Sequence, residues 1–446
     1  MIMAKVGLIC LGCPKNAVDA EEILGEIEQA GHEIVTEPGR AEVLIVNTCG
    51  FIESAKEESI EAILDAVRYK TNGDCRSVIV TGCLAQRYGA ELAKEFPEAD
   101  GIVGLGKSSE MAGMISRTLR GDRVIAIGEP SAWWMESRNR VLSTPPWTAY
   151  LRIADGCDNR CTYCVIPSIR GGFRSRAEQD VLDEAKALIS AGAKELNLIA
   201  QDVTRYGMDW AGEMQLSRLL NKLAALEGVH WIRLLYCHPA RISDELIRTI
   251  AGNEKICNYI DAPLQHCSSR VLGAMGRQGG KQEYLDLFAQ IRETCPDVAL
   301  RTTFIVGFPG ETEEDFEELL DFVSRVRFDR AGVFCYSAED GTPAALLPDQ
   351  LPHRTIERRY RRLMAHQQEI SLDKNEALVG KLMEVLVETV KGKSAVGRSY
   401  RDAPDIDGVV RIKTSPQTRP GDFVLAEVAE AEHYDLIGRC VDAVSA

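Results

Sequence analysis

The sequence contains no run of about eighteen apolar residues, so we expect no membrane-spanning helix. The first stretch, residues 1–10, is short and soon interrupted by Gly12 and Pro14, which does not resemble a secretion signal. Together these two absences lead us to expect a cytoplasmic protein.

Basic residues are also in short supply. There are 52 Lys and Arg against 67 Asp and Glu, which gives a net charge of −15. Phosphate contacts dominate nucleic-acid affinity and require a basic surface, so we do not expect RNA contact to dominate, although a local basic patch stays open. The acidic balance suits a basic protein partner, because opposite potentials steer association.

Histidine is scarce, with seven residues, whereas cysteine is plentiful, with 14. Disulfides rarely persist in a reducing cytosol, so a group of cysteines indicates metal ligation or catalysis. A chain of 446 residues is too long for one ordinary core and indicates several domains.

The first domain repeats one pattern three times. Apolar runs at residues 6–9, 43–46 and 78–80 lead to Cys13, Cys49 and Cys83, and amphipathic segments at 18–30 and 54–67 separate them. Continuous apolar strands alternating with such helices predict a parallel α/β sheet covered on both faces. Each cysteine then follows the carboxyl end of a strand, where open α/β sheets bind ligands.

A second β/α series is predicted to follow. Its six strands begin near Ala149, Glu195, His230, Asn258, Val298 and Arg330. Six units are fewer than the eight of a closed barrel, so we predict an open, partial (β/α)6 barrel with its site at the carboxyl ends of the strands. Short strands at 382–390, 408–412 and 423–428 predict a small β-barrel with nine basic and twelve acidic residues.

These patterns predict a multidomain α/β protein. The expected domains are residues 1–120, the open barrel at 148–375 and the small β-barrel at 376–446, with residues 121–147 as a linker.

Three cysteines lie close together at the start of the second series. Cys157, Cys161 and Cys164 follow a strand with the spacing C-x3-C-x2-C. Three thiolates bind three irons of a four-iron cluster and leave the fourth iron open, as a catalytic metal requires. The alternatives are a zinc site or three buried cysteines. The nearest histidines, His32 and His230, are too distant in sequence to complete a local zinc site.

This motif, after the first strand of a partial β/α barrel, resembles the radical S-adenosylmethionine superfamily. The resemblance implies that Cys157, Cys161 and Cys164 are catalytic and hold a [4Fe–4S] cluster whose open iron binds S-adenosylmethionine. It also implies that the reduced cluster cleaves this cofactor to a 5′-deoxyadenosyl radical, which abstracts a hydrogen atom from the substrate.

The other triplet resembles the methylthiotransferase family. Leu-Gly-Cys13-Pro-Lys-Asn, Val-Asn-Thr-Cys49-Gly-Phe and Val-Thr-Gly-Cys83-Leu-Ala-Gln look like that family's N-terminal domain. The resemblance implies that these cysteines hold a second [4Fe–4S] cluster with an open iron. It also implies that the C-terminal β-barrel is a TRAM domain.

Residues 166–171, 301–312 and 397–408 resemble the branch of that family which methylthiolates an aspartate in protein S-twelve of the small ribosomal subunit. Ribosomal proteins are generally basic, in agreement with the acidic chain. The β-carbon of aspartate is an unactivated C–H centre, for which a radical is needed. A reduced flavodoxin or ferredoxin is implied as the electron donor.

Four further residues are candidate cofactor ligands. Gln201 and Asp202 follow a strand at a position where the superfamily binds the methionine amino group, although a helix-capping turn is an alternative. Gln265 follows the strand that is predicted to begin near Asn258, and it is placed to reach the ribose or the substrate. Arg301 lies in a strand, where it could meet the cofactor's carboxylate or form a structural ion pair.

Two other functions compete. A family member that methylthiolates a tRNA adenosine predicts a basic C-terminal barrel, whereas this one is slightly acidic. A non-enzymatic iron–sulfur redox sensor or electron carrier predicts closed ligation by four cysteines, whereas both groups here contain three.

Overall fold

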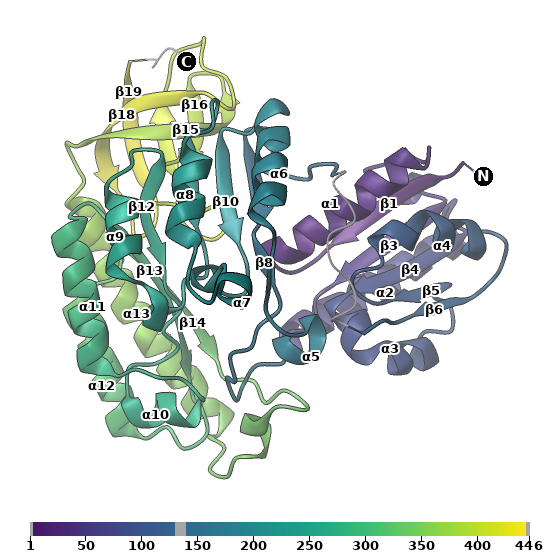
Figure 1. The fold of residues 1–446 in the computed structure, drawn as a ribbon, viewed down its shortest axis with the longest axis horizontal. Helices are drawn as coiled ribbons and strands as arrows, with labels where there is room; N and C mark the ends of the chain where they lie inside the picture. The colour runs from purple at the N-terminus through teal and green to yellow at the C-terminus, as the bar shows by residue number, and fades with distance from the viewer. Residues whose placement is uncertain (1–2, 130–139, 443–446) are drawn as a thin grey trace.

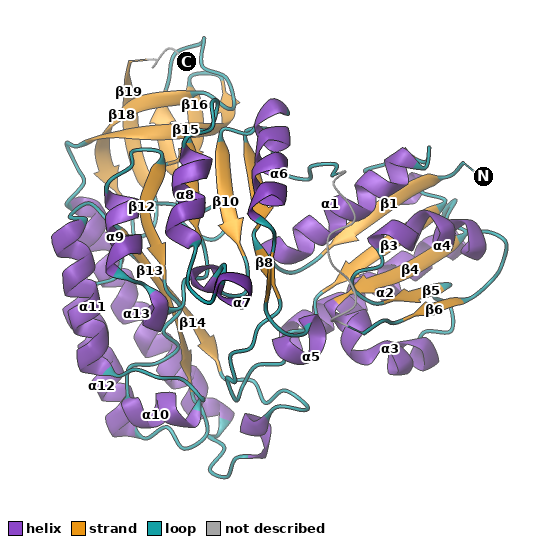
Figure 2. Ribbon diagram, in the orientation of Figure 1, coloured by secondary structure: helices purple, strands orange, loops and turns teal. Residues whose placement is uncertain are grey.

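A computed structural model describes residues 3–129 and 140–442 of the chain. It contains two six-stranded parallel sheets and a closed five-stranded barrel (Figures 1 and 2). None of the helices in the described residues combines the length and the apolar character needed to cross a membrane.

The N-terminal sheet has the strand order β2-β1-β3-β4-β5-β6, and all its pairs are parallel. The strands are β1 (Lys5–Cys10), β2 (Glu33–Ile34), β3 (Val43–Thr48), β4 (Ser77–Gly82), β5 (Gly101–Val103) and β6 (Val124–Ala126). Helices α1 (Pro14–Gln29) and α4 (Met111–Thr118) pack on one face, while α2 (Glu53–Asn72) and α3 (Cys83–Glu95) pack on the other. The predicted parallel sheet with both faces covered is confirmed.

Strand β6 lies in the stretch that the sequence led us to expect as a linker. It pairs with β5 through Ile102 and Ile125, so the first domain extends at least to Ala126. The run from Val124 to Ala126 is too short to show a strand period, which explains why the pattern did not reveal it. Residues 130–139 of the expected linker lie outside the described residues.

The second sheet has the order β7-β10-β11-β12-β13-β14, is parallel throughout and stays open. Its strands are β7 (Thr148–Arg152), β10 (Glu195–Ile199), β11 (Trp231–Leu234), β12 (Ile256–Asp261), β13 (Ala299–Val306) and β14 (Arg330–Cys335), in agreement with all six predicted strands. The helices along it are α6 (Glu178–Ser190), α8 (Leu216–Ala224), α9 (Asp244–Ala251), α10 (Ser269–Ala274), α11 (Lys281–Thr294), α12 (Glu313–Val326) and α13 (His353–Glu376). The predicted partial barrel is therefore confirmed.

Four short elements lie in the loops of this barrel. They are the paired strands β8 (Ala154–Asp155) and β9 (Arg174–Ser175), with helices α5 (Ile166–Arg170) and α7 (Met208–Ala211).

The C-terminal barrel closes in the order β15-β16-β17-β19-β18. Its strands are β15 (Leu382–Lys391), β16 (Ser394–Arg398), β17 (Val410–Lys413), β18 (Phe423–Ala431) and β19 (Leu436–Asp442). Sequence analysis predicted three of the five and missed β16 and β19, which each contain an internal glycine. A β-carbon on Gly397 would lie 2.2 Å from the Leu386 carbonyl oxygen, so this glycine allows a close crossing of strands that weakens the sequence pattern.

The end of β16 and the loop after it, residues 397–408, close the amino end of the open sheet, and we call this segment the plug. Arg398 of the plug ion-pairs with Glu195 at 2.6 Å, and Glu195 also pairs with Arg233 at 3.1 Å. Tyr259 donates a hydrogen bond of 2.7 Å to Asp407 of the plug. Figure 1 shows the C-terminal barrel beyond the end at which the strands of the open sheet begin. The plug therefore covers the interior of the open sheet at its amino end.

Replacing Glu195 by Gln should lower the free energy of unfolding by about 3–5 kcal/mol, because two buried guanidinium groups lose their anion. Burial opposes ionisation of this carboxyl group, but Arg398 and Arg233 outweigh it and lower the pKa of Glu195 to about 2. Its stabilisation is therefore complete above the unfolded pKa of about 4.3 and is lost as the pH falls towards 2. Urea unfolding at several pH values measures both effects. Glu427→Gln in β18 is the control, and an equal loss in both variants would contradict the prediction.

Candidate functional site

The three N-terminal cysteines lie at the carboxyl edge of the first sheet. Cys13 follows β1 and caps α1, Cys49 follows β3, and Cys83 is the first residue of α3. A β-carbon on Gly12 would lie 2.9 Å from the β-carbon of Cys49, and Gly12 has a φ of 95°, so the loop before Cys13 requires glycine to approach Cys49 this closely. The structure thus brings together the cysteines that the strand pattern had predicted to be neighbours.

The environment of these thiols suits metal ligation only after deprotonation. Burial raises the pKa of the Cys83 thiol to about 12 and also raises the pKa of Cys49. The metal-free thiols of Cys49 and Cys83 therefore keep their protons at neutral pH, and binding of iron has to displace these protons. The amide groups at the starts of α1 and α3 favour the resulting negative charge at Cys13 and Cys83.

The second triplet lies in one loop between β8 and α5. Cys157, Cys161 and Cys164 are all half-buried and form no disulfide. The amide of Cys157 donates to Gly171 at 3.0 Å, and the amide of Thr162 donates to Met275 at 2.9 Å. Burial raises the pKa of Cys157 to about 11 and that of Cys164 to about 12.

Two arginines of the barrel fix the residues between these cysteines. Arg241 donates to Asn159 at 2.9 Å and ion-pairs with Asp202 at 2.6 Å. Arg277 donates to the hydroxyl of Tyr163 at 3.4 Å. The loop is therefore held on both sides before any metal binds.

Arg170, the last residue of α5, connects the two cysteine groups. Its guanidinium is 1% exposed and pairs with Asp155 of the barrel at 3.0 Å and with Asp19 of α1 at 2.6 Å. It also donates to the sulfur of Cys83 at 3.8 Å. Burial opposes its charge, yet Asp19 and Asp155 raise the pKa of Arg170 well above its ordinary value, so the guanidinium stays charged.

Apolar packing follows the same path. Val165, which directly follows Cys164, and Ile169 of α5 form one buried cluster with Cys83 and Leu105. On another side, Glu339 of the barrel ion-pairs with Arg87 at 3.0 Å and with Lys56 at 3.2 Å. The two cysteine groups therefore belong to one interdomain site.

Gln201 and Asp202 both lie beside the cysteine loop. Gln201 donates from its side-chain nitrogen to Asp155 at 2.7 Å, while its side-chain oxygen is buried without a partner in the structure. Asp202 is 1% exposed and is engaged by Arg241, Asn159 and Thr204. Of the two, Gln201 has the free polar atom that a ligand could use.

Gln265 lies at the carboxyl end of the barrel in a strained conformation. Its φ is 73°, and its backbone bridges to β13 through hydrogen bonds with Thr303 and Ile305. Strained residues other than glycine cluster at functional sites. Its half-buried side chain makes no hydrogen bond within the part of the chain that the structure describes.

Arg301 does not lie where a cofactor ligand was expected. Its guanidinium pairs with Asp261 at 2.8 Å and with Asp407 of the plug at 3.3 Å. Because both of these buried carboxylates already hold it, the structural ion pair is the alternative that fits, and the expectation of a contact with the cofactor's carboxylate is corrected.

The two groups of cysteines offer ligand atoms of the type that binds iron–sulfur clusters. Each set offers three thiols, and the unpartnered oxygen of Gln201 and the unpartnered Nδ1 of His238 lie in the loops that follow β10 and β11. Within residues 3–129 and 140–442, no three His, Cys, Asp or Glu side chains converge as the ligands of a single metal ion do. Thiolates that bind different irons of one cluster are spread around it rather than converging.

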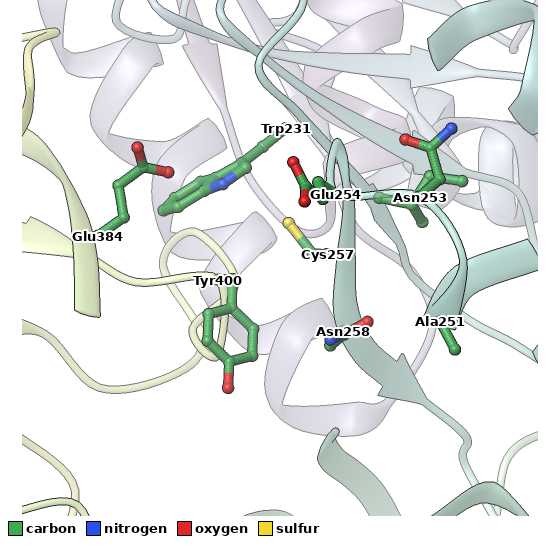
Figure 3. Close-up of a pocket in the computed structure, with 9 residues that line it drawn as sticks. Trp231, Ala251, Asn253, Glu254, Cys257, Asn258, Glu384 and Tyr400 are labelled. Carbon is green, nitrogen blue, oxygen red and sulfur yellow. The ribbon is translucent and has the colours of Figure 1, made fainter. Parts of the chain in front are cut away.

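A cavity of about 270 Å³ lies elsewhere in the barrel. Figure 3 shows Trp231, Cys257, Glu384 and Tyr400 around it, at the amino ends of β11 and β12 next to the plug. It is therefore at the end of the barrel opposite to the cysteines and does not belong to their site.

Sequence reasoning assigned no role to several residues that the structure brings to the site. They are Lys15, Asn16, Asn159, Arg170, Tyr236 and His238. Asn16 accepts from Arg170 at 2.9 Å and lies three residues after Cys13, which is the only local signal of its place. Arg170 meets partners far away in sequence, so no local pattern could have revealed it.

Three family descriptions match the chain in the order of its domains. Residues 5–104 match Uncharacterized protein family UPF0004, residues 151–323 match the radical SAM superfamily, and residues 379–441 match the TRAM domain.

Similar proteins cover the whole chain. Ribosomal protein uS12 methylthiotransferase RimO of Pelotomaculum thermopropionicum is 52% identical over 440 residues, or 98% of this chain and 99% of that protein. A protein of the same name from Geobacter sulfurreducens is 49% identical over 441 residues, or 98% of each chain.

Among solved structures, the radical S-adenosylmethionine methyltransferase TsrM of Kitasatospora setae, with cobalamin and a [4Fe–4S] cluster bound, is similar with a TM-score of 0.57. It is 16% identical, and the similarity covers 88% of this chain and 80% of TsrM. At that identity the likeness shows the fold alone.

Replacing Arg170 by Gln should loosen the contact between the domains, because Asp19 and Asp155 lose one of the two guanidinium groups that they share and keep only Arg152. Removing one partner of a buried ion pair costs about 3–5 kcal/mol, so we expect backbone amides at the start of α1 and in α5 to exchange faster by about a hundredfold to several thousandfold. Hydrogen exchange with mass spectrometry measures this. Arg68→Gln removes an exposed arginine of α2 as the control, and a uniform change along the chain would contradict the prediction.

Proposed function

This chain belongs to the RimO family of ribosomal protein uS12 methylthiotransferases, and we propose that it adds a CH3–S group to the β-carbon of an aspartate in uS12, protein S-twelve of the small ribosomal subunit. It is a radical S-adenosylmethionine enzyme that uses two [4Fe–4S] clusters. The observation that carries the proposal is the interdomain site, in which two groups of three cysteines are joined through Arg170.

We propose that Cys157, Cys161 and Cys164 hold the catalytic cluster. When bound, the cluster and S-adenosylmethionine supply the electron and the radical that break an unactivated C–H bond. The chain's own residues would orient and shield them. Arg241 and Arg277 fix the loop, and the free oxygen of Gln201 is available to accept a hydrogen bond from the cofactor's amino group. Asp202 would act by holding Arg241, and Gln265 is retained as a candidate for the ribose or the substrate.

We propose that Cys13, Cys49 and Cys83 hold the second cluster, which would carry the sulfur to be methylated and transferred. Arg170 donates to Cys83 and would stabilise negative charge on that sulfur. The same residue ties α1 to the barrel, so it would keep the second cluster close to the first.

We propose a reduced flavodoxin or ferredoxin as the electron donor, since the first cluster must be reduced before each turnover. A ribosomal-protein substrate favours the cytoplasm as the site of the reaction. The slightly acidic C-terminal barrel supports a protein substrate over a tRNA adenosine.

The two clusters should be separable by mutation. Cys157→Ala should abolish cleavage of S-adenosylmethionine, because the catalytic cluster loses a ligand. Cys49→Ala should spare that cleavage and abolish methylthio transfer, because only the second cluster is affected. Chromatography of 5′-deoxyadenosine and of modified peptide measures the two reactions in the same sample. Cys335→Ala, an exposed cysteine of β14, is the control. Substrate modification by Cys49→Ala at the normal rate would show that the two-cluster assignment is wrong.

Mass spectrometry of uS12 from cells with and without this gene tests the substrate. We expect one aspartate-containing peptide to be heavier by CH2S only when the gene is present. An unchanged peptide would remove uS12 as the substrate and direct the same comparison to tRNA adenosines.

A further inference from the structure

Lys15, the second residue of α1, places an ammonium group inside the interdomain site. Its side chain is 8% exposed, and its Nζ lies 3.3 Å from the centre of the Tyr236 ring. Tyr236 follows the carboxyl end of β11, whereas Lys15 comes two residues after Cys13. The contact therefore joins the carboxyl edges of the two parallel sheets.

No carboxylate among the described residues forms an ion pair with Lys15, and the acidic groups around it are already engaged. Asp19 pairs with Arg152 and Arg170. Asp261 pairs with Arg301 at 2.8 Å and accepts from the amide of Tyr236 at 2.9 Å. A buried ammonium without an anion is unfavourable by several kcal/mol, and a cation–π contact recovers about 2 kcal/mol of that. The site is therefore suited to an anion from outside the chain.

The backbone at Tyr236 supports a functional reading of this contact. Tyr236 has a φ of 65°, which is rare for a residue other than glycine and strained for an aromatic one. The bond from its amide to Asp261 holds this conformation. Its ring is thereby presented to Lys15 and keeps the ammonium at the junction of the two domains.

The cysteines next to Lys15 have other positive groups. Arg170 contacts Cys83, and the amide groups that begin α1 and α3 face Cys13 and Cys83. Neutralising the second cluster therefore does not require Lys15.

We propose that Lys15 binds the side-chain carboxylate of the substrate aspartate and so makes the enzyme select an acidic residue. This inference rests on the proposed function. The β-carbon is bonded directly to that carboxylate, so an ion pair with Lys15 fixes the carbon that loses its hydrogen between the two cysteine groups. An asparagine in the same place has no charge to pair with Lys15 and binds more weakly.

The test compares the anaerobic, cluster-loaded enzyme with its Lys15→Met and Lys15→Arg variants. The ligands are uS12 with its target aspartate and uS12 with asparagine at that position. Wild type should bind the aspartate form about tenfold to a hundredfold more tightly, the usual worth of a hydrogen bond to a charged group. Lys15→Met should bind both forms equally, at the level of the asparagine form. Lys15→Arg keeps the charge and should restore part of the preference.

Two further measurements distinguish this role of Lys15 from a structural role. Iron content and the midpoint potential of the first cluster should be unchanged in Lys15→Met. Lys107→Met, a partly exposed lysine paired with Glu110 in the same domain, is the matched control. An unchanged preference in Lys15→Met would overturn the proposal, as would a shifted potential of the second cluster with the preference retained.

The wild-type enzyme provides a comparison of the two uS12 forms that does not depend on how the variants fold. Equal binding of the two uS12 forms by wild-type enzyme that still modifies the aspartate would overturn the role of Lys15 alone. Failure of wild type to modify uS12 at all would instead overturn the proposed function.

Discussion

A buried guanidinium between carboxylates of two domains is the contact on which this site depends. Arg170 reaches Asp155 in the barrel and Asp19 in the first domain, and Arg152 joins the same network through both of these residues. Such a network is stable only when every charge is paired and hydrogen-bonded, because each buried ion has lost its hydration. The domains therefore meet in one register, with the carboxyl ends of both sheets directed to a common space.

The plug covers one end of the open sheet, so the two ends of the sheet differ. An open six-stranded sheet leaves its interior accessible at both ends, but the plug fills the amino end through Arg398, Asp407 and their partners. The amino end of the interior is thereby covered, whereas the carboxyl end faces the first domain. A radical enzyme benefits from such closure, since excluding water and stray hydrogen donors protects a reactive intermediate.

Most of the architecture could be predicted from the sequence. The six barrel strands and the strand-to-cysteine repeats follow from local periodicity, as the structure confirms. Two kinds of strand were missed because they show too little alternation of apolar and polar residues. They are strands with an internal glycine, such as β16, and the three-residue strand β6.

The contacts within the site were less accessible to sequence reasoning. Arg301 and Arg170 look alike in sequence, yet one is tied to the plug and the other to Cys83. Their partners are distant along the chain and are chosen by tertiary packing, which no local period records. The cysteine spacing succeeded because a cluster demands several ligands of one type, whereas a single arginine has many alternative partners.

The plug also determines the order in which the buried ion pairs of the barrel can form during synthesis. Glu195 is made early and shares its charge between Arg233 and Arg398, while Arg301 shares its charge between Asp261 and Asp407. In each case the second partner lies in the plug, which is synthesised after all the strands of the barrel. During synthesis from the amino terminus, the barrel interior therefore stays hydrated until the C-terminal domain emerges and folds. An enzyme that acts on a component of the ribosome thus completes its own core only after the plug has left the ribosome.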